Sequence, residues 1–215
     1  MERGKFITVE GIEGTGKSTN IEFLTSLIKK NGYEVYCTRE PGGTPMAEKI
    51  RGLLLEHGQE PLPEIAELLL FFAARSLHLR NAIEPALDLG KWVVCDRFTD
   101  ASRAYQGSGR GLDLEQIECL AEWVQQGLEP DITLLLDAPA EVGMERAAAR
   151  GDADRMDSEE LAFYRRVRSG YLALADMHPE RFIVVDASQS LDKVQESIAE
   201  KLGSYFSSKN IKKNS

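Results

Sequence analysis

The sequence predicts an α/β fold in which helices cover both faces of a five-stranded parallel sheet. Short apolar stretches alternate along the chain with longer segments of helical periodicity. Such alternation is typical of βαβ units joined by right-handed crossovers. The stretch at 91–96 is a nearly continuous apolar run, as expected of a central strand that is buried on both faces. With 215 residues and no break in composition, the chain is expected to form one domain over 1–206.

The first strand and helix flank a glycine-rich stretch at 11–16. An apolar, β-branched run at 5–10 predicts the strand, and apolar residues with a helical period predict the helix that Asn31-Gly32 ends. A second strand is expected at 34–38. Residues 39–44 can continue neither kind of element, so they are expected to form a loop at the end of that strand.

Two further helices precede the third strand. Thr44 followed by Pro45 begins a helix that is expected to end at Leu55. Two prolines then break the chain, and a long helix is expected at about 64–89. Pro85 predicts a kink near its end, because proline lacks a backbone N–H.

The second half of the chain repeats the alternation. After the strand at 91–96, the glycines of 107–111 predict a flexible loop. The remaining strands are expected at 132–137 and 181–186. The remaining helices are expected at about 114–127, 140–150, from 158 to about 177, and 191–205. The polar tail at 207–215 is expected to be frayed.

Residues 11–18 match the phosphate-binding pattern G-x-x-x-x-G-K-[ST], in the strand-loop-helix context that it requires. Its glycines let successive backbone N–H groups point at a phosphate, and the following helix adds its positive end. Lys17 can reach the outer phosphates, and the Ser18 hydroxyl can ligate Mg²⁺. A glycine-rich turn that binds nothing is disfavoured, because a cation opposes the dipole at a helix start unless an anion lies there. We therefore expect a three-layer P-loop NTPase fold, whose ATP-binding residues are Gly11, Ile12, Glu13, Gly14, Thr15, Gly16, Lys17, Ser18 and Thr19.

An acidic residue ends the buried third strand. Asp96 is the best candidate for a Mg²⁺ carboxylate beside Ser18, because the carboxyl ends of parallel strands meet at one edge. The alternative is a cap for the next helix. Asp137 ends the following strand but is more consistent with a cap, since no phosphate-binding group follows it.

Arginine and aromatic residues indicate a second ligand at the same edge. Arg51 and Arg97 can each grip a phosphate, and the P-loop already holds those of ATP. A second phosphorylated substrate is therefore expected, with surface salt bridges as the alternative. Phe71 and Arg75 share a helix face and can stack on and hydrogen-bond a nucleobase, although Phe71 alone is also consistent with a core position. The groups suited to reading a base or sugar are Ser102, Tyr105 and Gln106.

Three arginines bracket a polar segment between two helices. Arg146, Arg150 and Arg155 lie in a segment at about 146–158 that is expected to act as a lid and to bring an arginine to the transferring phosphoryl group. A solvated charged connector is the alternative.

Composition excludes several classes of partner. The net charge of −9 argues against a nucleic-acid polymer or an acidic membrane surface. The longest apolar run is too short to span a bilayer. Three scattered cysteines without C-x-x-C spacing suit reduced thiols, so a cytoplasmic location is expected.

Six motifs follow one another along the chain: Gly11-x-Glu13-Gly14-x-Gly16-Lys17-Ser18, Thr38-Arg39-Glu40-Pro41-Gly42-Gly43-Thr44-Pro45, Glu48-Lys49-Ile50-Arg51, Phe71-x-Ala73-Ala74-Arg75, Asp96-Arg97-Phe98 and Ala104-Tyr105-Gln106-Gly107-x-Gly109-Arg110-Gly111. In this order they resemble bacterial thymidylate kinases of the P-loop nucleoside monophosphate kinase family. The resemblance extends from Lys5 to about Leu202.

The resemblance implies an enzyme that phosphorylates dTMP to dTDP with ATP and Mg²⁺, a step of dTTP synthesis for DNA replication. Arg51 and Arg97 would hold the phosphate of dTMP. Phe71 would stack on thymine, Arg75 would bond its edge, and Tyr105 would crowd the 2′ position of the sugar. A homodimer packed through helices is also implied.

The same resemblance assigns the remaining residues. Glu13 would contact the 3′-hydroxyl or its water shell, and Glu40 and Gln106 would complete the nucleotide site. Two positions depart from the pattern. Residue 101 is Ala where relatives usually carry a hydroxyl, which moves that thymine contact to Ser102, and Phe98 stands where Tyr or His is common.

Catalysis would consist of alignment and charge neutralisation by Lys17, Arg97, Mg²⁺ and the lid arginines. No general base is required, because the second pKa of a phosphate monoester is about 6. Two alternatives stay open. One is a kinase for another nucleoside monophosphate; the other is a P-loop ATPase or GTPase-like binding module, although the chain contains neither D-x-x-G nor N-K-x-D.

Overall fold

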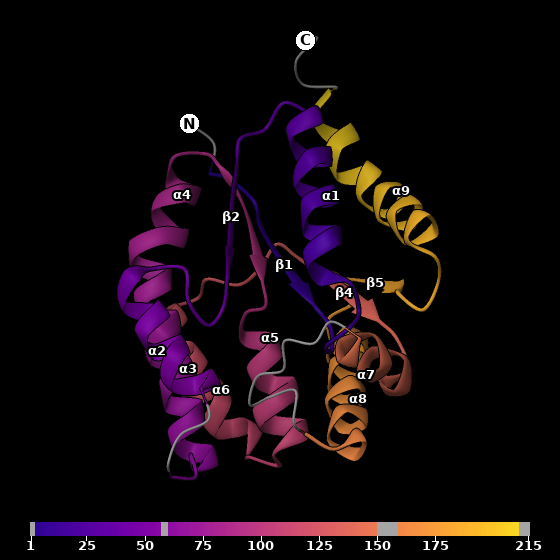
Figure 1. Ribbon diagram of the computed structural model, residues 1–215. Helices are drawn as coiled ribbons and strands as arrows, with labels where there is room; N and C mark the ends of the chain where they lie inside the picture. Colours follow the sequence, from indigo (N-terminus) through magenta and orange to yellow (C-terminus); the bar gives the residue numbers. More distant parts are fainter. Residues whose placement is uncertain (1–2, 57–59, 150–158, 211–215) are drawn as a thin grey trace.

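The computed structural model describes residues 3–56, 60–149 and 159–210 of the chain (Figure 1). Within these residues the strands are β1 (Phe6–Glu10), β2 (Val35–Arg39), β3 (Trp92–Asp96), β4 (Ile132–Asp137) and β5 (Phe182–Asp186). The α-helices are α1 (Lys17–Lys30), α2 (Pro45–Leu55), α3 (Glu64–His78), α4 (Glu84–Asp88), α5 (Thr99–Ser102), α6 (Leu114–Gln125), α7 (Ala140–Ala148), α8 (Leu161–Met177) and α9 (Leu191–Asn210). Two π-helical segments, η1 (Leu79–Ile83) and η2 (Arg103–Gly109), continue α3 and α5.

The strands form one parallel sheet in the order β2-β3-β1-β4-β5. This arrangement confirms the predicted α/β fold. The central strand β1 lies between β3 and β4, with Val9 opposite Asp96 and Leu134. Because the strands are parallel, the loops that follow β1, β2 and β3 meet at one edge of the sheet, where ligands bind in such folds.

Alternate residues of the strands face two different helical layers. Ile7, Val94 and Leu134 pack with buried residues of α1 and α9, which lie side by side in Figure 1. Phe6 and Val93 face the opposite layer, built from η1 and α4. On that second face, η2 and α8 cover β4 and β5. The sheet is therefore the middle of three layers, as the apolar strands predicted.

The long helix expected at 64–89 is divided in the structure. Helix α3 ends at His78, the π-helical segment η1 follows, and α4 begins at Glu84. Pro85 lacks the N–H that an uninterrupted helix would use, and the wider π-helical turn lies directly before it.

The prediction of a flexible loop at 107–111 is wrong. Residues 103–109 form the π-helical segment η2, and Gly107 and Gly109 are buried. A Cβ at Gly107 would lie 2.7 Å from the Leu114 side chain, and one at Gly109 would lie 2.7 Å from Phe163. These glycines permit close packing against α6 and α8 rather than flexibility.

The C-terminal helix is longer than expected. Helix α9 runs to Asn210, so the first residues of the predicted frayed tail are helical, and 211–215 lie outside the described residues. Phe206 is buried and stacks on Trp92 at a centroid distance of 5.6 Å, which anchors the helix beyond residue 205. Across the described ranges, no helix is long and apolar enough to cross a membrane.

Candidate active site

The phosphate loop connects β1 to α1 at the centre of the sheet. Gly11, Gly14 and Gly16 have φ angles of 139°, 72° and 79°, conformations that L side chains rarely adopt. A Cβ at Gly14 would lie 2.0 Å from the backbone oxygen of Gly143 in α7. Glycine therefore permits the positive φ angles of this loop, and at position 14 it also leaves room for α7.

The side chain of Lys17 folds back over this loop. Its Nζ donates to the backbone oxygens of Gly11 and Ile12, at 3.1 and 2.8 Å. Burial and the nearby charge of Arg97 lower the pKa of Lys17 to about 8. A bound phosphate would supply the negative charge that stabilises the ammonium group here.

Arg97 lies beside the loop with an unusual backbone conformation. Its φ angle is 68°, and its N–H donates to Val9 O at 3.0 Å. The guanidinium donates to Gly11 O at 3.0 Å and to the hydroxyl of Tyr171 at 3.2 Å. A left-handed conformation in a non-glycine residue is strained and is often found at functional sites.

Glu13 joins Arg97 to the aromatic side of the site. Its carboxylate oxygens accept from Arg97 and from the hydroxyl of Tyr105, each at 2.5 Å. Burial alone would raise the pKa of Glu13, but the charges of Arg97 and Lys17 outweigh burial and lower it. Tyr105 also stacks under the Arg97 guanidinium, whose carbon lies 4.7 Å from the ring centroid. An ionised Glu13 therefore holds Arg97 and Tyr105 together.

Arg75 has two groups of donors with different surroundings. Its Nε donates to Glu40 at 2.7 Å, and its Nη2 donates to Phe98 O and to the Ser102 hydroxyl, both at 3.1 Å. Its Nη1 is buried and makes no hydrogen bond within the described structure. A buried donor without a partner is costly, so this atom is poised for an acceptor on a ligand.

A second buried polar atom without a partner lies at the end of β3. Asp96 Oδ1 makes no hydrogen bond with the described residues, and both Asp96 and Ser18 line the cavity described below. Carboxylate and hydroxyl oxygens are ligands that suit Mg²⁺. In the part of the chain that the structure describes, no three His, Cys, Asp or Glu residues form a metal-binding cluster, so most ligands of such an ion would come from phosphates and water.

One cavity of about 550 Å³ brings these groups together. Its volume is within the range of small-molecule sites. Most of the predicted site residues line it: Glu13, Gly14, Gly16, Lys17, Ser18, Thr19, Glu40, Arg51, Phe71, Arg75, Asp96, Arg97, Ser102, Tyr105, Gln106 and Arg146. Gly11, Ile12 and Thr15 belong to the loop but do not line the cavity. Arg150, Arg155 and most of the lid expected at 146–158 lie outside the described residues.

Several predicted side chains have partners that the sequence did not indicate. Arg146 donates to Ala187 O and Ser188 O, at 2.7 and 3.3 Å, which joins α7 to the end of β5. Arg51 donates to Pro41 O at 2.8 Å. Asp137 pairs with Arg168 at 2.7 Å, so it is an ion-pair residue rather than the expected cap.

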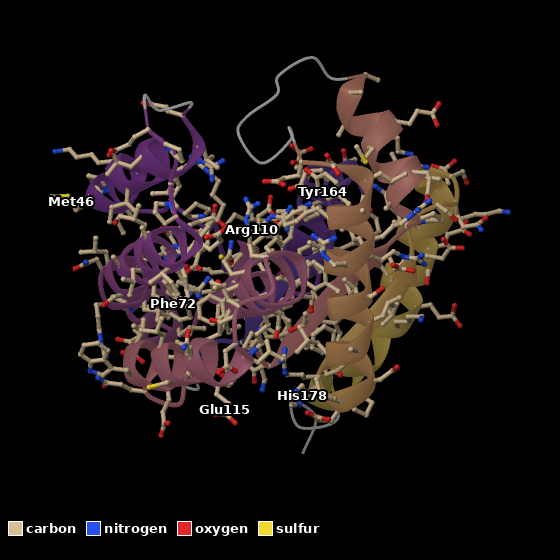
Figure 2. The ribbon with its side chains drawn as sticks, turned by 90° about the horizontal axis from the view of Figure 1, so that it is seen from below. Met46, Phe72, Arg110, Glu115, Tyr164 and His178 are labelled. Carbon is tan, nitrogen blue, oxygen red and sulfur yellow. The ribbon has the colours of Figure 1, made fainter. Side chains whose placement is uncertain are left out.

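Gln106, which lines the cavity, is held by a buried carboxylate on α3. Glu67 accepts from Gln106 at 2.9 Å and from Arg110, whose Nη2 lies 3.3 Å away. Arg110 also lies over the Phe163 ring of α8. Figure 2 shows Arg110 between Phe72 of α3 and Tyr164 of α8. Of the two phenylalanines on α3, Phe72 is buried in the core, whereas Phe71 lines the cavity.

Four buried polar residues around the site were not predicted from the sequence. They are Glu10, Glu67, His78 and Tyr171. A signal for two of them existed, because Glu67 and His78 fall on the face of α3 that carries Phe71 and Arg75, at intervals of three and four residues. No local pattern could indicate that Tyr171 reaches Glu10.

A family model described as thymidylate kinase matches residues 9–198. The chain belongs to the thymidylate kinase family. It is 58% identical over 201 residues to the thymidylate kinase of Chromohalobacter salexigens, covering 93% of this chain and 95% of that protein. It is 54% identical over 204 residues to the thymidylate kinase of Methylococcus capsulatus, covering 95% and 97%. The crystal structure of thymidylate kinase from Ehrlichia chaffeensis aligns with a TM-score of 0.73 and 35% identity, covering 94% of this chain and 99% of that one.

Membership of the thymidylate kinase family confirms three predictions. The resemblance, the P-loop NTPase fold and the ATP-dependent kinase activity toward thymidylate were all expected from the motifs. The individual roles expected of the site residues stay predictions.

Proposed function

We propose that this thymidylate kinase transfers the γ-phosphoryl group of ATP to the 5′-phosphate of dTMP, giving dTDP for the synthesis of dTTP. One observation supports a site with two halves, one for ATP and one for dTMP. A single cavity joins the glycine-rich phosphate loop to a buried, unpartnered donor of Arg75. The loop suits the phosphates of a nucleotide, and the unpartnered donor suits the acceptor edge of a base.

The donor half consists of the phosphate loop and the start of α1. Backbone N–H groups of 11–19 bind the phosphates of ATP, and Lys17 moves from its contacts with Gly11 and Ile12 onto the outer phosphates. Ser18 and Asp96 would hold Mg²⁺, which would supply positive charge to the phosphates of ATP. The unpartnered Oδ1 of Asp96 supports this assignment.

The acceptor half lies between α2, α3 and η2. Phe71 lines the cavity one helical turn from Arg75, so its ring can stack on thymine while the Nη1 of Arg75 donates to the base edge. Arg51 and Arg97 hold the phosphate of dTMP. Tyr105, fixed by its bond to Glu13, crowds the 2′ position of the sugar.

Glu13, Glu40, Ser102 and Gln106 complete this half. Glu13 lines the cavity between the two phosphate sites, where it meets the 3′-hydroxyl or its water shell. Ser102 and Glu40 act largely through Arg75, which both of them contact. The hydroxyl expected at position 101 is replaced in this chain by Ala101, which lines the cavity without a polar atom.

The mechanism is alignment of two charged phosphates. The dTMP oxygen is already ionised near neutral pH, so no proton acceptor is needed. Lys17 and Arg97 neutralise the charge of the reacting groups, together with arginines of the proposed lid, Arg146, Arg150 and Arg155. An arginine that acts on such a transition state can contribute roughly 10³ to 10⁵ in rate.

A homodimer is the second part of the proposal. Large apolar side chains are exposed on three neighbouring helices: Met46 and Leu53 on α2, Ile65 and Leu69 on α3, and Leu114 and Trp123 on α6. Met46 points away from the body of the protein in Figure 2. Exposed apolar side chains on helices that contact one another suit an interface with a second copy of the chain. Trp123→Glu should yield monomers in light scattering after size exclusion, whereas Ser26→Glu on α1 should not.

We assign residues 1–206 to one kinase domain with a lid at about 146–158. A cytoplasmic location agrees with the absence of a membrane-spanning helix among the described residues and with three free cysteines.

A substrate panel tests the proposal. With ATP and Mg²⁺, turnover on dTMP should exceed turnover on deoxyuridylate, cytidylate and adenylate in a coupled ADP assay. The preference over deoxyuridylate depends on one methyl group, worth about 1–3 kcal/mol. Faster turnover on another monophosphate would favour a different nucleotide kinase. Hydrolysis of ATP without an acceptor would favour a P-loop ATPase or GTPase-like module.

A further inference from the structure

The direction of the free Arg75 donor depends on Glu40. Arg75 has a side-chain exposure of 2%, and its Nε and Nη2 donors are already bound to protein oxygens. Because the guanidinium is planar, these bonds also fix the direction in which its Nη1 points. Of these partners, Glu40 is the only carboxylate, so it makes the strongest of these bonds.

Glu40 is in turn held by a buried histidine. His78 Nδ1 lies 3.1 Å from the Glu40 carboxylate oxygen that Arg75 Nε does not use. The Nε2 of the same ring lies 2.6 Å from the hydroxyl of Thr38 at the end of β2. The His78 side chain has no exposure to solvent. Both ring nitrogens are thus engaged by protein atoms.

The hydrogen-bonding roles in this chain follow from its partners. An ionised carboxylate only accepts, so Nδ1 of His78 carries the proton that it donates to Glu40. In a neutral ring Nε2 then accepts from the Thr38 hydroxyl. The ring also contacts Gly43, where a Cβ would lie 2.3 Å from Nε2. Thr38 and Gly43 therefore fix the ring from its far side.

We propose that His78 is a positioning residue for base recognition in this thymidylate kinase. With Thr38 it fixes Glu40, and Glu40 fixes Arg75, so that Nη1 meets a carbonyl oxygen on the edge of the base. The inference rests on the proposed contact between Arg75 and the base. Its consequence is selectivity for a base with a carbonyl oxygen at that edge over one with an amino group, because an amino group cannot accept from Arg75.

The test compares dTMP with 5-methyl-deoxycytidylate, which keeps the methyl group but exchanges one carbonyl for an amino group. His78→Leu removes both hydrogen bonds and should raise KM for dTMP roughly tenfold, while KM for ATP stays unchanged. The ratio of kcat/KM for dTMP to kcat/KM for 5-methyl-deoxycytidylate should fall roughly tenfold. His78→Asn should restore most of the ratio, because its side-chain amide can donate to Glu40 as Nδ1 does. Thr38→Val should give an intermediate loss.

Two controls separate this inference from instability and from the proposed function. Leu79 is buried and follows His78 in the sequence, and its side chain makes no hydrogen bond to Glu40. Leu79→Ala therefore serves as a stability control. Where it lowers the melting temperature as much as His78→Leu does, it should still leave the ratio unchanged. Arg75→Met should abolish the discrimination. If Arg75→Met does so and neither His78→Leu nor Thr38→Val lowers the ratio, the inference is overturned while the base contact of Arg75 stands. If Arg75→Met leaves the ratio unchanged, both are overturned.

Discussion

Glu10 should make the stability of this protein fall with rising pH. It ends β1 with no exposure to solvent, and its carboxyl accepts from Phe98 N–H at 2.7 Å. The Tyr171 hydroxyl lies 2.7 Å from its other oxygen. Burial, assisted by the charge of Asp100, raises the pKa of Glu10 from 4.5 to about 8. The folded protein therefore keeps this proton in a range of pH where the unfolded chain has released it.

The sign and size of the effect follow from proton linkage. Below pH 4.5 both states are protonated, and the contribution of Glu10 to stability is complete. Between pH 4.5 and about 8 the folded state binds the extra proton, so the free energy of unfolding falls by about 1.4 kcal/mol per pH unit. Between pH 5 and pH 8 the loss amounts to about 3–4 kcal/mol. This is a large part of the roughly 5–15 kcal/mol that stabilises an ordinary domain.

Glu10→Gln isolates this contribution. The glutamine oxygen can still accept from Phe98, and its amide can donate to Tyr171, but the side chain no longer titrates. Urea unfolding followed by circular dichroism at several pH values should show the variant gaining about 3–4 kcal/mol relative to the parent protein between pH 5 and pH 8. Glu22→Gln, on the exposed side of α1, controls for the change in net charge. A stability difference that is constant over this range would refute the reasoning.

Three further predictions concern the loop and its support. Because the pKa of Lys17 is about 8, kcat/KM for ATP should decline above that pH as the ammonium is lost, and a flat profile to pH 9.5 would contradict this. Gly14→Ala should weaken ATP binding in calorimetry, since its Cβ would strike α7 and its φ is 72°; unchanged affinity would show that the loop tolerates a side chain there. Asp100→Ala should lower the free energy of unfolding by about 3–5 kcal/mol, because Asp100 pairs with the largely buried Arg103 and Arg181. A loss below about 1 kcal/mol would mean that both arginines find other partners.

The phosphate loop could be predicted from sequence because its spacing is itself a geometry. Glycine, lysine and serine at fixed intervals between a strand and a helix leave few other conformations. The glycines at 107 and 109 carried no such information. Glycine permits both a flexible turn and close packing, and only the positions of Leu114 and Phe163 decide between the two.

The residues of the proposed acceptor site could be grouped from the sequence where they share one helix. Phe71 and Arg75 are one turn apart, and extending that stripe to Glu67 and His78 would have found the buried polar residues behind the proposed base site. The bond between Tyr171 and Glu10 joins residues 161 positions apart. It depends on how α8 crosses the sheet, which the sequence pattern leaves open.

Asp96, Arg97 and Phe98 show how these separate contacts depend on one strained turn. The side chains of these three neighbours have different surroundings. Asp96 leaves one carboxylate oxygen without a partner and lines the cavity, and Arg97 donates to the phosphate loop. Phe98 enters the core beneath Arg75, with its ring centroid 5.2 Å from the guanidinium carbon. Ordinary strand geometry would place the first and third side chains on one face. The left-handed conformation of Arg97 breaks that alternation, at a cost of roughly 1–2 kcal/mol.

The end of β1 offsets this cost. Arg97 N–H donates to Val9 O, and Phe98 N–H donates to the carboxyl of Glu10, so two successive donors of the turn have buried acceptors on the central strand. The acceptor of Phe98 is a carboxyl whose proton is retained up to about pH 8, and its other oxygen meets the same Tyr171 hydroxyl that accepts from Arg97. Tyr171 and Glu10 therefore hold both the backbone and the guanidinium of Arg97. Glu10→Ala would release that backbone, so it should lower kcat and destabilise the protein together, whereas Glu10→Gln should separate the two effects.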